Sequence, residues 1–195
     1  MSIEIHPIKL TGSWDSGYAL DKHIMFSTPI GLNPYGHTEF DTHRTPIGEA
    51  LYQFKYNHKT EFLTDIVDTI VDFLNNNSDY ANIGAIIPAP PSKHRLVQPV
   101  FEISKAVSKK LQIPYVEDVL EKNSNIESKG LSLSEKDKIK GHITKRRRAN
   151  RKHNILIIDD IFSTGATLSE CSKILRTDPL VNNIYVLTIT KTKHR

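Results

Sequence analysis

Short aliphatic runs alternate along this chain with stretches whose apolar residues recur at helical spacing. The runs at residues 83–88, 155–158 and 184–189 are typical of strands buried on both faces. Between them, residues 100–111 and 168–175 place their apolar side chains on one helical face and predict helices. Strands separated by helices imply right-handed crossovers. We therefore predict an α/β fold whose mainly parallel, twisted sheet is flanked by helices.

The first part of the chain differs in composition, with many turn-forming and aromatic residues and short runs in which apolar and polar residues alternate. Residues 1–44 are predicted to form a small β-rich elaboration, and residues 45–195 the α/β core. Thr45 and Pro46 suit the cap and first position of a helix. A helix is also expected over residues 62–74, and a further strand over residues 114–120.

Composition narrows the class of protein without identifying it. Of 195 residues, 38% are apolar and 25% charged, and no apolar run approaches the roughly 18 residues that span a bilayer. The N-terminus lacks a secretory pattern, so a cytoplasmic location and no membrane partner are expected. The single cysteine, Cys171, excludes an internal disulfide and lies on the apolar face of a predicted helix, as a small core residue would.

Two polar clusters each leave two interpretations open. Six basic residues crowd positions 145–152, including Arg146 and Lys152, and would form either a solvated loop or a contact with nucleic acid or polyphosphate. His37, Asp41 and His43 could meet as metal ligands, or strand alternation could turn all three towards solvent.

The most informative segment is residues 155–167, in which four aliphatic residues deliver Asp159 and Asp160 to a sheet edge. A turn of small and hydroxyl residues follows and opens a helix: Ser163, Thr164, Gly165, Ala166 and Thr167. Backbone N–H groups at a helix start bind phosphate, and Gly165 permits close approach. The two acids suit ribose hydroxyls or a hard cation nearby. An acidic turn with a capping hydroxyl is the plainer alternative, and neither a P-loop nor a dinucleotide fingerprint is present.

This segment resembles the signature with which type I phosphoribosyltransferases bind 5-phosphoribosyl-1-pyrophosphate (PRPP). The resemblance implies that Asp159 and Asp160 hold the ribose and, directly or indirectly, Mg²⁺, while residues 163–167 hold the 5′-phosphate. Phe162 is bulkier than the aliphatic residue usual at its position.

Two further segments resemble those of the ComF-like and amidophosphoribosyltransferase-like branches. Residues 87–95 are similar to their pyrophosphate loop, which implies that pyrophosphate is bound by Pro91, Ser92, Lys93 and Arg95. Exposed basic residues on an ordinary loop are the alternative there. Residues 129–141 look like a mobile active-site loop that brings Lys129 to the leaving group as a third catalytic residue, and residues 51–56 resemble a short Leu-Lys-Tyr-like element.

The resemblance implies a phosphoribosyltransferase that uses PRPP with Mg²⁺ and displaces pyrophosphate at ribose C1 by a nitrogen nucleophile, such as a nucleobase, an amine or ammonia. The cysteine zinc ribbon usual in ComF-like proteins is missing, and residues 1–44 could instead form a hood that selects the acceptor. A catalytically silent PRPP- or nucleotide-sensing regulator, and a nucleic-acid-associated accessory protein, stay open as alternatives. A homodimer is compatible with the sequence.

Overall fold

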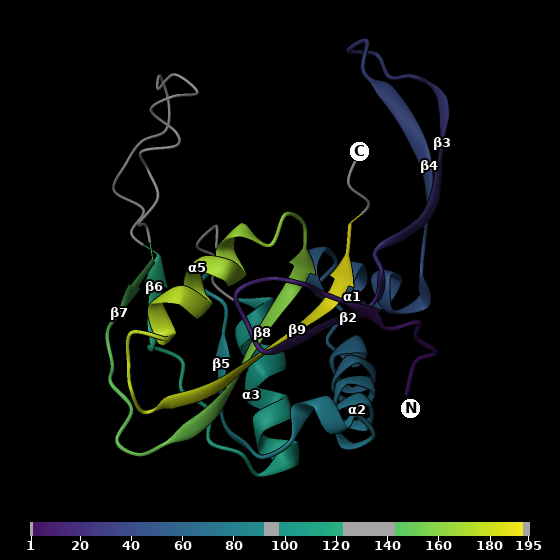
Figure 1. Cartoon of the computed structure of the whole chain (residues 1–195). Coiled ribbons are helices and arrows are strands. Elements are labelled where there is room, and N and C mark those ends of the chain that lie inside the picture. The colour runs from purple at the N-terminus through teal and green to yellow at the C-terminus, as the bar shows by residue number, and fades with distance from the viewer. Residues whose placement is uncertain (1, 92–97, 123–142, 193–195) are drawn as a thin grey trace, which may run out of the picture.

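The computed structural model describes residues 2–91, 98–122 and 143–192, and a five-stranded sheet forms its centre (Figure 1). The strands follow the order β1-β2-β9-β8-β5. Their bounds are β1 Ile8–Lys9, β2 Ser16–Lys22, β9 Val181–Lys191, β8 His153–Phe162 and β5 Ile83–Pro88.

All neighbouring strands of this sheet run parallel except β1, which pairs with β2 in the antiparallel sense. Strand β8 lies between β5 and β9, with Leu156 in register with Ile86 and Ile157 with Val186. Successive side chains of β8 enter the two hydrophobic cores on opposite faces of the sheet. The predicted parallel sheet is confirmed, and burial on both faces explains why its strands read as continuous aliphatic runs.

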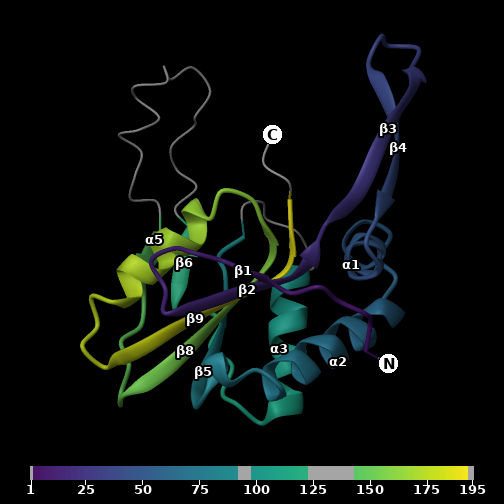
Figure 2. The same ribbon diagram turned by 45° about the vertical axis from the view of Figure 1, so that its right-hand side comes forward.

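Helices cover both faces of the sheet, as the two views in Figures 1 and 2 show. The helices are α1 Pro46–Tyr56, α2 Glu61–Asn75, α3 Pro99–Leu111 and α5 Ala166–Leu175, with a short 3₁₀ helix at Ser78–Tyr80. The first three pack on one face, around Leu156 and Ile158. Helix α5 packs on the other, where Cys171 is fully buried as predicted. At the start of α1 the Thr45 hydroxyl accepts a hydrogen bond from the Gly48 N–H over 3.1 Å, as the sequence predicted.

The N-terminal part of the chain divides between the sheet and a separate hairpin. Strands β1 and β2 belong to the core sheet because β2 pairs with β9 along most of its length. Only β3 (Ile24–Leu32) and β4 (Thr38–Arg44) stand apart, as a two-stranded hairpin that projects from the body of the molecule (Figures 1 and 2). The core sheet therefore contains strands from both sides of residue 44, where the sequence suggested a division.

A second difference concerns residues 114–120, where a strand was expected. The backbone there makes one isolated bridge between Tyr115 and Ile86, and the regular strand β6 begins only at Leu120 (Leu120–Lys122). It pairs with β7 (Ile143–Lys145) in a small separate sheet that packs against α5. Within the described residues, no helix is long and apolar enough to cross a membrane.

Candidate functional site

A cavity of about 390 Å³ opens at the edge of the sheet where β5 and β8 end. Parallel strands bring their carboxyl ends to the same edge, so the segments that follow them become neighbours. The cavity is lined by the end of α1, the segment after β5, the start of α3 and the whole β8–α5 turn: Lys55, Tyr56, Ala89, Pro90, Pro91, Gln98, Pro99, Val100 and residues 159–168.

The turn between β8 and α5 is held by an aromatic support beneath Gly165. Gly165 has φ +75°, and a Cβ atom there would lie 2.8 Å from the Phe162 ring. That ring is buried and meets Trp14 edge-on, with centroids 6.3 Å apart. The departure from the usual aliphatic residue therefore has a structural reason, since Phe162 joins the turn to the core.

The turn presents its polar groups to the cavity at the start of α5. Ser163, Thr164 and Ala166 are exposed, Thr167 is half-buried, and the Thr164 hydroxyl accepts a hydrogen bond from the Ala166 N–H over 3.3 Å. The first N–H groups of a helix have no partner within the helix and carry partial positive charge. This is the arrangement that binds an anion such as phosphate.

The two acids that precede the turn face opposite sides of the sheet. Asp160 forms an ion pair with Lys55, which α1 brings from one face. Asp159 is in register with Thr188 of β9 and lies near Cys171 on the other face. The pKa of the Cys171 thiol is raised mainly by burial and, as the second cause, by the charge of Asp159. Both carboxyl groups nevertheless line the same cavity.

Asp159 is held in an environment that opposes its ionisation. The pKa of Asp159 is raised to about 7. Burial is the larger cause, and repulsion from the Asp160 carboxylate is the second. The Asp160 N–H donates to Asp159 Oδ1 over 2.8 Å and offsets part of this effect. Lys55 and, more weakly, Lys122 oppose this rise in the pKa of Asp159.

Lys55 is a site residue that the sequence analysis did not assign. It occupies the last turn of α1 with its side chain only 14% exposed, and its Nζ lies 5.6 Å from the centre of the Tyr56 ring. The resemblance of residues 51–56 to a Leu-Lys-Tyr-like element was the available signal. The contact with Asp160, 105 positions later, depends on how α1 packs on the sheet, which no local pattern shows.

The segment after β5 approaches the turn through the sheet. The Ala89 N–H donates to the Ile158 carbonyl over 2.8 Å, which extends the pairing of β5 and β8 to the cavity. Pro90 and Pro91 then line it. The other residues predicted to bind pyrophosphate or the leaving group, Ser92, Lys93, Arg95 and Lys129, lie outside the described residues.

The basic segment at residues 145–152 lies away from this cavity and is partly neutralised by ion pairs. Arg146 pairs with Glu121, and Arg147 with Asp118. The side chain of Lys145 lies 3.1 Å from Asp178, with both largely buried. Hydrogen bonds from the backbone N–H groups of Ala149 and Leu180 help to hold the pKa of Asp178 below its usual value. Three of the six basic residues, Lys145, Arg146 and Arg147, therefore form ion pairs within the protein.

Of the three residues that could have met as metal ligands, His43 and Asp41 are in contact with each other. On β4 the His43 and Asp41 side chains are 3.1 Å apart, and the Phe26 ring stacks on His43 with centroids 4.4 Å apart. Within residues 2–91, 98–122 and 143–192, no group of three or more histidine, cysteine or acidic side chains is arranged to hold a metal ion.

Comparison with solved structures identifies the fold. Adenine phosphoribosyltransferase from Trypanosoma brucei, solved with AMP, pyrophosphate and ribose-5-phosphate, matches with a TM-score of 0.53 and 13% identity, over 96% of this chain and 75% of that one. Adenine phosphoribosyltransferase from Leishmania tarentolae matches with a TM-score of 0.51 and 11% identity, over 96% and 95%. The chain has the type I phosphoribosyltransferase fold.

Other comparisons add little to this assignment. The chain spans only 26% of the length of Leishmania donovani UMP synthase, with 14% identity over 82% of this chain and a TM-score of 0.41. No protein-family model and no curated protein matches the chain. The ComF-like branch therefore stays a prediction.

Proposed function

We propose that this chain is a phosphoribosyltransferase that binds PRPP with Mg²⁺ and displaces its pyrophosphate with a nitrogen nucleophile. One observation carries the proposal: a helix-opening turn of small and hydroxyl residues shares a cavity with two carboxyl groups. The turn at residues 163–167 suits a 5′-phosphate, and Asp159 and Asp160 suit the ribose hydroxyls beside it.

The residues of the cavity also fit a magnesium ion. Carboxylate oxygens are ligands that Mg²⁺ prefers, and the raised pKa of Asp159 indicates negative charge that a cation would stabilise. Asp159 and Asp160 would hold the ion directly or through water. When bound, Mg²⁺ neutralises charge that develops on the pyrophosphate.

Lys55 would act through Asp160. Its ammonium group forms an ion pair with that carboxylate and would hold it in place beside the cavity, where the ribose would lie. We assign it as a positioning residue. Lys93, Arg95 and Lys129 are proposed to stabilise the leaving pyrophosphate, because charge-assisted hydrogen bonds to phosphate are strong.

The reaction requires no nucleophilic side chain. As the C1–oxygen bond of PRPP breaks, positive charge develops on the ribose ring and negative charge on pyrophosphate, and a nitrogen lone pair of the acceptor forms the new bond to C1. The chain's part is to position the sugar and stabilise both charges.

Pyrophosphate release tests the activity directly. Purified protein with PRPP and Mg²⁺ should release pyrophosphate when a nucleobase, an amine or ammonia is supplied, and each acceptor is tested separately. PRPP binding without release for any acceptor would indicate the silent, PRPP-sensing regulator instead. Absence of both would remove the proposal.

A further inference from the structure

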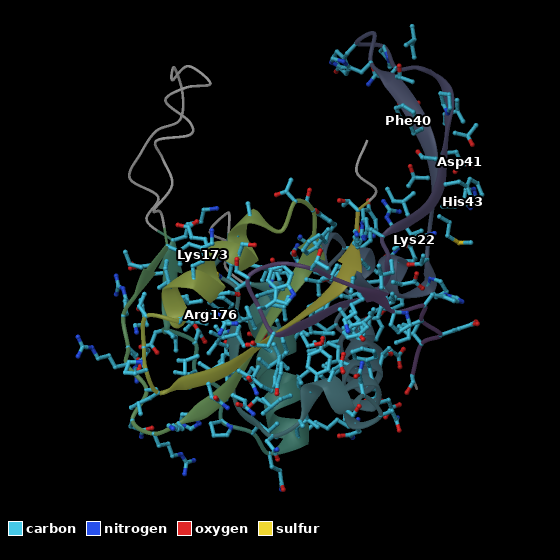
Figure 3. All side chains as sticks on the ribbon, viewed as in Figure 1. Lys22, Phe40, Asp41, His43, Lys173 and Arg176 are labelled. Carbon is cyan, nitrogen blue, oxygen red and sulfur yellow. The ribbon has the colours of Figure 1, made fainter. Side chains whose placement is uncertain are left out.

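The β3–β4 hairpin, residues 24–44, forms an arm that projects from the body of the protein. This arm carries most of the exposed large apolar side chains of the described residues. Seven large hydrophobic residues are exposed among the described residues, and six of them lie on the arm. These six are Met25, Phe26, Ile30, Leu32, Tyr35 and Phe40. Figure 3 shows that the part of the arm carrying Phe40, Asp41 and His43 stands clear of the body of the protein, with Phe40 on the opposite side of the ribbon from Asp41 and His43.

The arm contacts the rest of the molecule at its base. There Arg44 pairs with Glu49 over 3.3 Å and lies 3.7 Å above the centre of the Tyr52 ring. Beyond Ile24, every residue of β3 is exposed. An isolated two-stranded hairpin is at best marginally stable in water, so a ribbon this long calls for a surface to pack against.

The contacts within the arm do not cover its apolar side chains. Ser27 and Thr42 share a hydrogen bond of 2.9 Å across the two strands, and Phe26 stacks on His43. Ile30, Leu32 and Tyr35 are nevertheless 64%, 72% and 85% exposed. These three lie in the half of the arm farther from its base, where it is most separate from the core (Figure 2).

We propose that the arm is a dimerisation element that packs against the arm of a second copy of this chain. Only one other large hydrophobic residue of the described chain is exposed, the single Tyr56 at the cavity. The arm therefore finds a matching apolar surface on another arm, as expected of an isologous twofold interface.

The area available suits such an interface. At about 100 Å² for each of six large side chains, the two faces of the arm together offer roughly 600 Å², about three quarters of the ~800 Å² that each partner supplies to a standard interface. Edge pairing of strands would add to it. On β3, Pro29 has no N–H to donate, so β4, which contains no proline, is the better edge for pairing.

The charge of the arm favours a second copy over an anionic partner. The arm contains two carboxylates, Glu39 and Asp41, one arginine, Arg44, and no lysine, although the whole chain has a net charge of +4. Binding to nucleic acid or to an acidic membrane surface depends on clustered basic residues. A nearly neutral arm can approach its own copy without strong repulsion.

Sedimentation velocity of the full chain at micromolar concentrations tests the proposal. The wild type should sediment as a dimer. The variant Ile30→Ser/Leu32→Ser/Tyr35→Ser should dissociate at least about tenfold more readily, because it loses half of the large apolar contacts. None of these residues packs in the core, and circular dichroism checks that the variant is folded.

The matched control is Ser27→Ala/Thr42→Ala, which changes two polar residues of the same arm and should leave the dimer intact. A wild type that is monomeric, or a dimer that the triple serine variant leaves unchanged, overturns the proposal.

Crosslinking provides an independent measurement. Because Cys171 is buried, Asp41→Cys places an accessible thiol at the middle of β4, the edge expected to pair, and mild oxidation should join two arms through it. Lack of a crosslinked dimer under conditions that oxidise the thiol would contradict arm-to-arm packing. No arm residue lines the cavity, so PRPP binding by the serine variant reports on the proposed function separately.

Discussion

At the single residue Asp159, a position suited to ligand binding is combined with an environment that disfavours the charged carboxylate. Its position in the cavity suits ligand binding, but burial beside Asp160 raises its pKa to about 7. An unfolded aspartate loses its proton near pH 4, so between about pH 4 and 7 the folded state holds more protons than the unfolded state. This contribution to stability is present below pH 4 and is lost as the pH rises through 7.

Asp159→Asn should therefore stabilise the free protein at pH 8, by on the order of 1–2 kcal/mol, and flatten the dependence of stability on pH between 4 and 7. Urea unfolding at a series of pH values measures both effects. A variant less stable than the wild type at pH 8, with the same pH dependence, would show that the carboxyl group is not strained.

Lys55 gives a second prediction at this scale. Lys55→Met removes a positive charge that lowers the pKa of Asp159, so Asp159 should then bind a proton more readily. PRPP and Mg²⁺ binding should weaken about tenfold at pH 7 and partly recover at higher pH. Lys55→Arg should retain most of the affinity. A loss that does not change with pH would point to a purely structural role for Lys55.

Individual residues were predicted unequally well from the sequence. Asp159, Asp160 and the hydroxyl turn could be proposed from the sequence because they are contiguous and follow a buried strand, and the structure places them at one cavity. The opposite orientations of the two acids follow from strand alternation combined with the packing of α1 and α5. Lys55 and Trp14 depend on contacts between distant segments, which a local pattern does not contain.

At the scale of elements, the β8–α5 turn depends on one glycine and the ring below it. Gly165→Ala should destabilise the protein by about 1–3 kcal/mol, because it combines a left-handed backbone with a contact of 2.8 Å to Phe162. In Gly165→Ala/Phe162→Leu the contact is relieved and the strain of the backbone persists.

Urea unfolding of the two single variants and the double variant measures the coupling. The double variant should be less destabilised than the sum of the single variants. Additive effects would show that the ring does not restrict position 165.

Elements with strong periodicity were predictable, and those defined by pairing were not. The strands at the centre of the sheet and the helices α2, α3 and α5 follow from apolar spacing because burial determines both. The N-terminal segment was treated as one β-rich unit because its turn-rich texture is uniform. Its division between the core sheet and the arm is decided by the pairing of β2 with β9, which forms between residues far apart in the chain.

For the whole molecule, the fold assembles the cavity proposed to bind PRPP from segments that are far apart in the sequence. The end of α1, the segment after β5 and the β8–α5 turn meet because parallel strands end at a common edge. The arm rises from the same edge, beside the ends of β8 and β9, but contributes nothing to the cavity of its own chain (Figure 1). Binding and association are therefore assigned to separate parts of the protein.

Asp159 and Asp160, with the adjoining turn, are proposed to bind an activated pentose phosphate. Isothermal titration of the full chain with PRPP and Mg²⁺ tests this proposal most directly. The control is Asp68→Asn/Asp118→Asn, which changes two acids that form ion pairs elsewhere on the surface. Asp159→Asn/Asp160→Asn should weaken binding at least about a hundredfold, since each lost charged contact costs more than 1 kcal/mol, while the control should bind as the wild type does. Equal affinity of the wild type and the Asp159→Asn/Asp160→Asn variant would contradict the proposal.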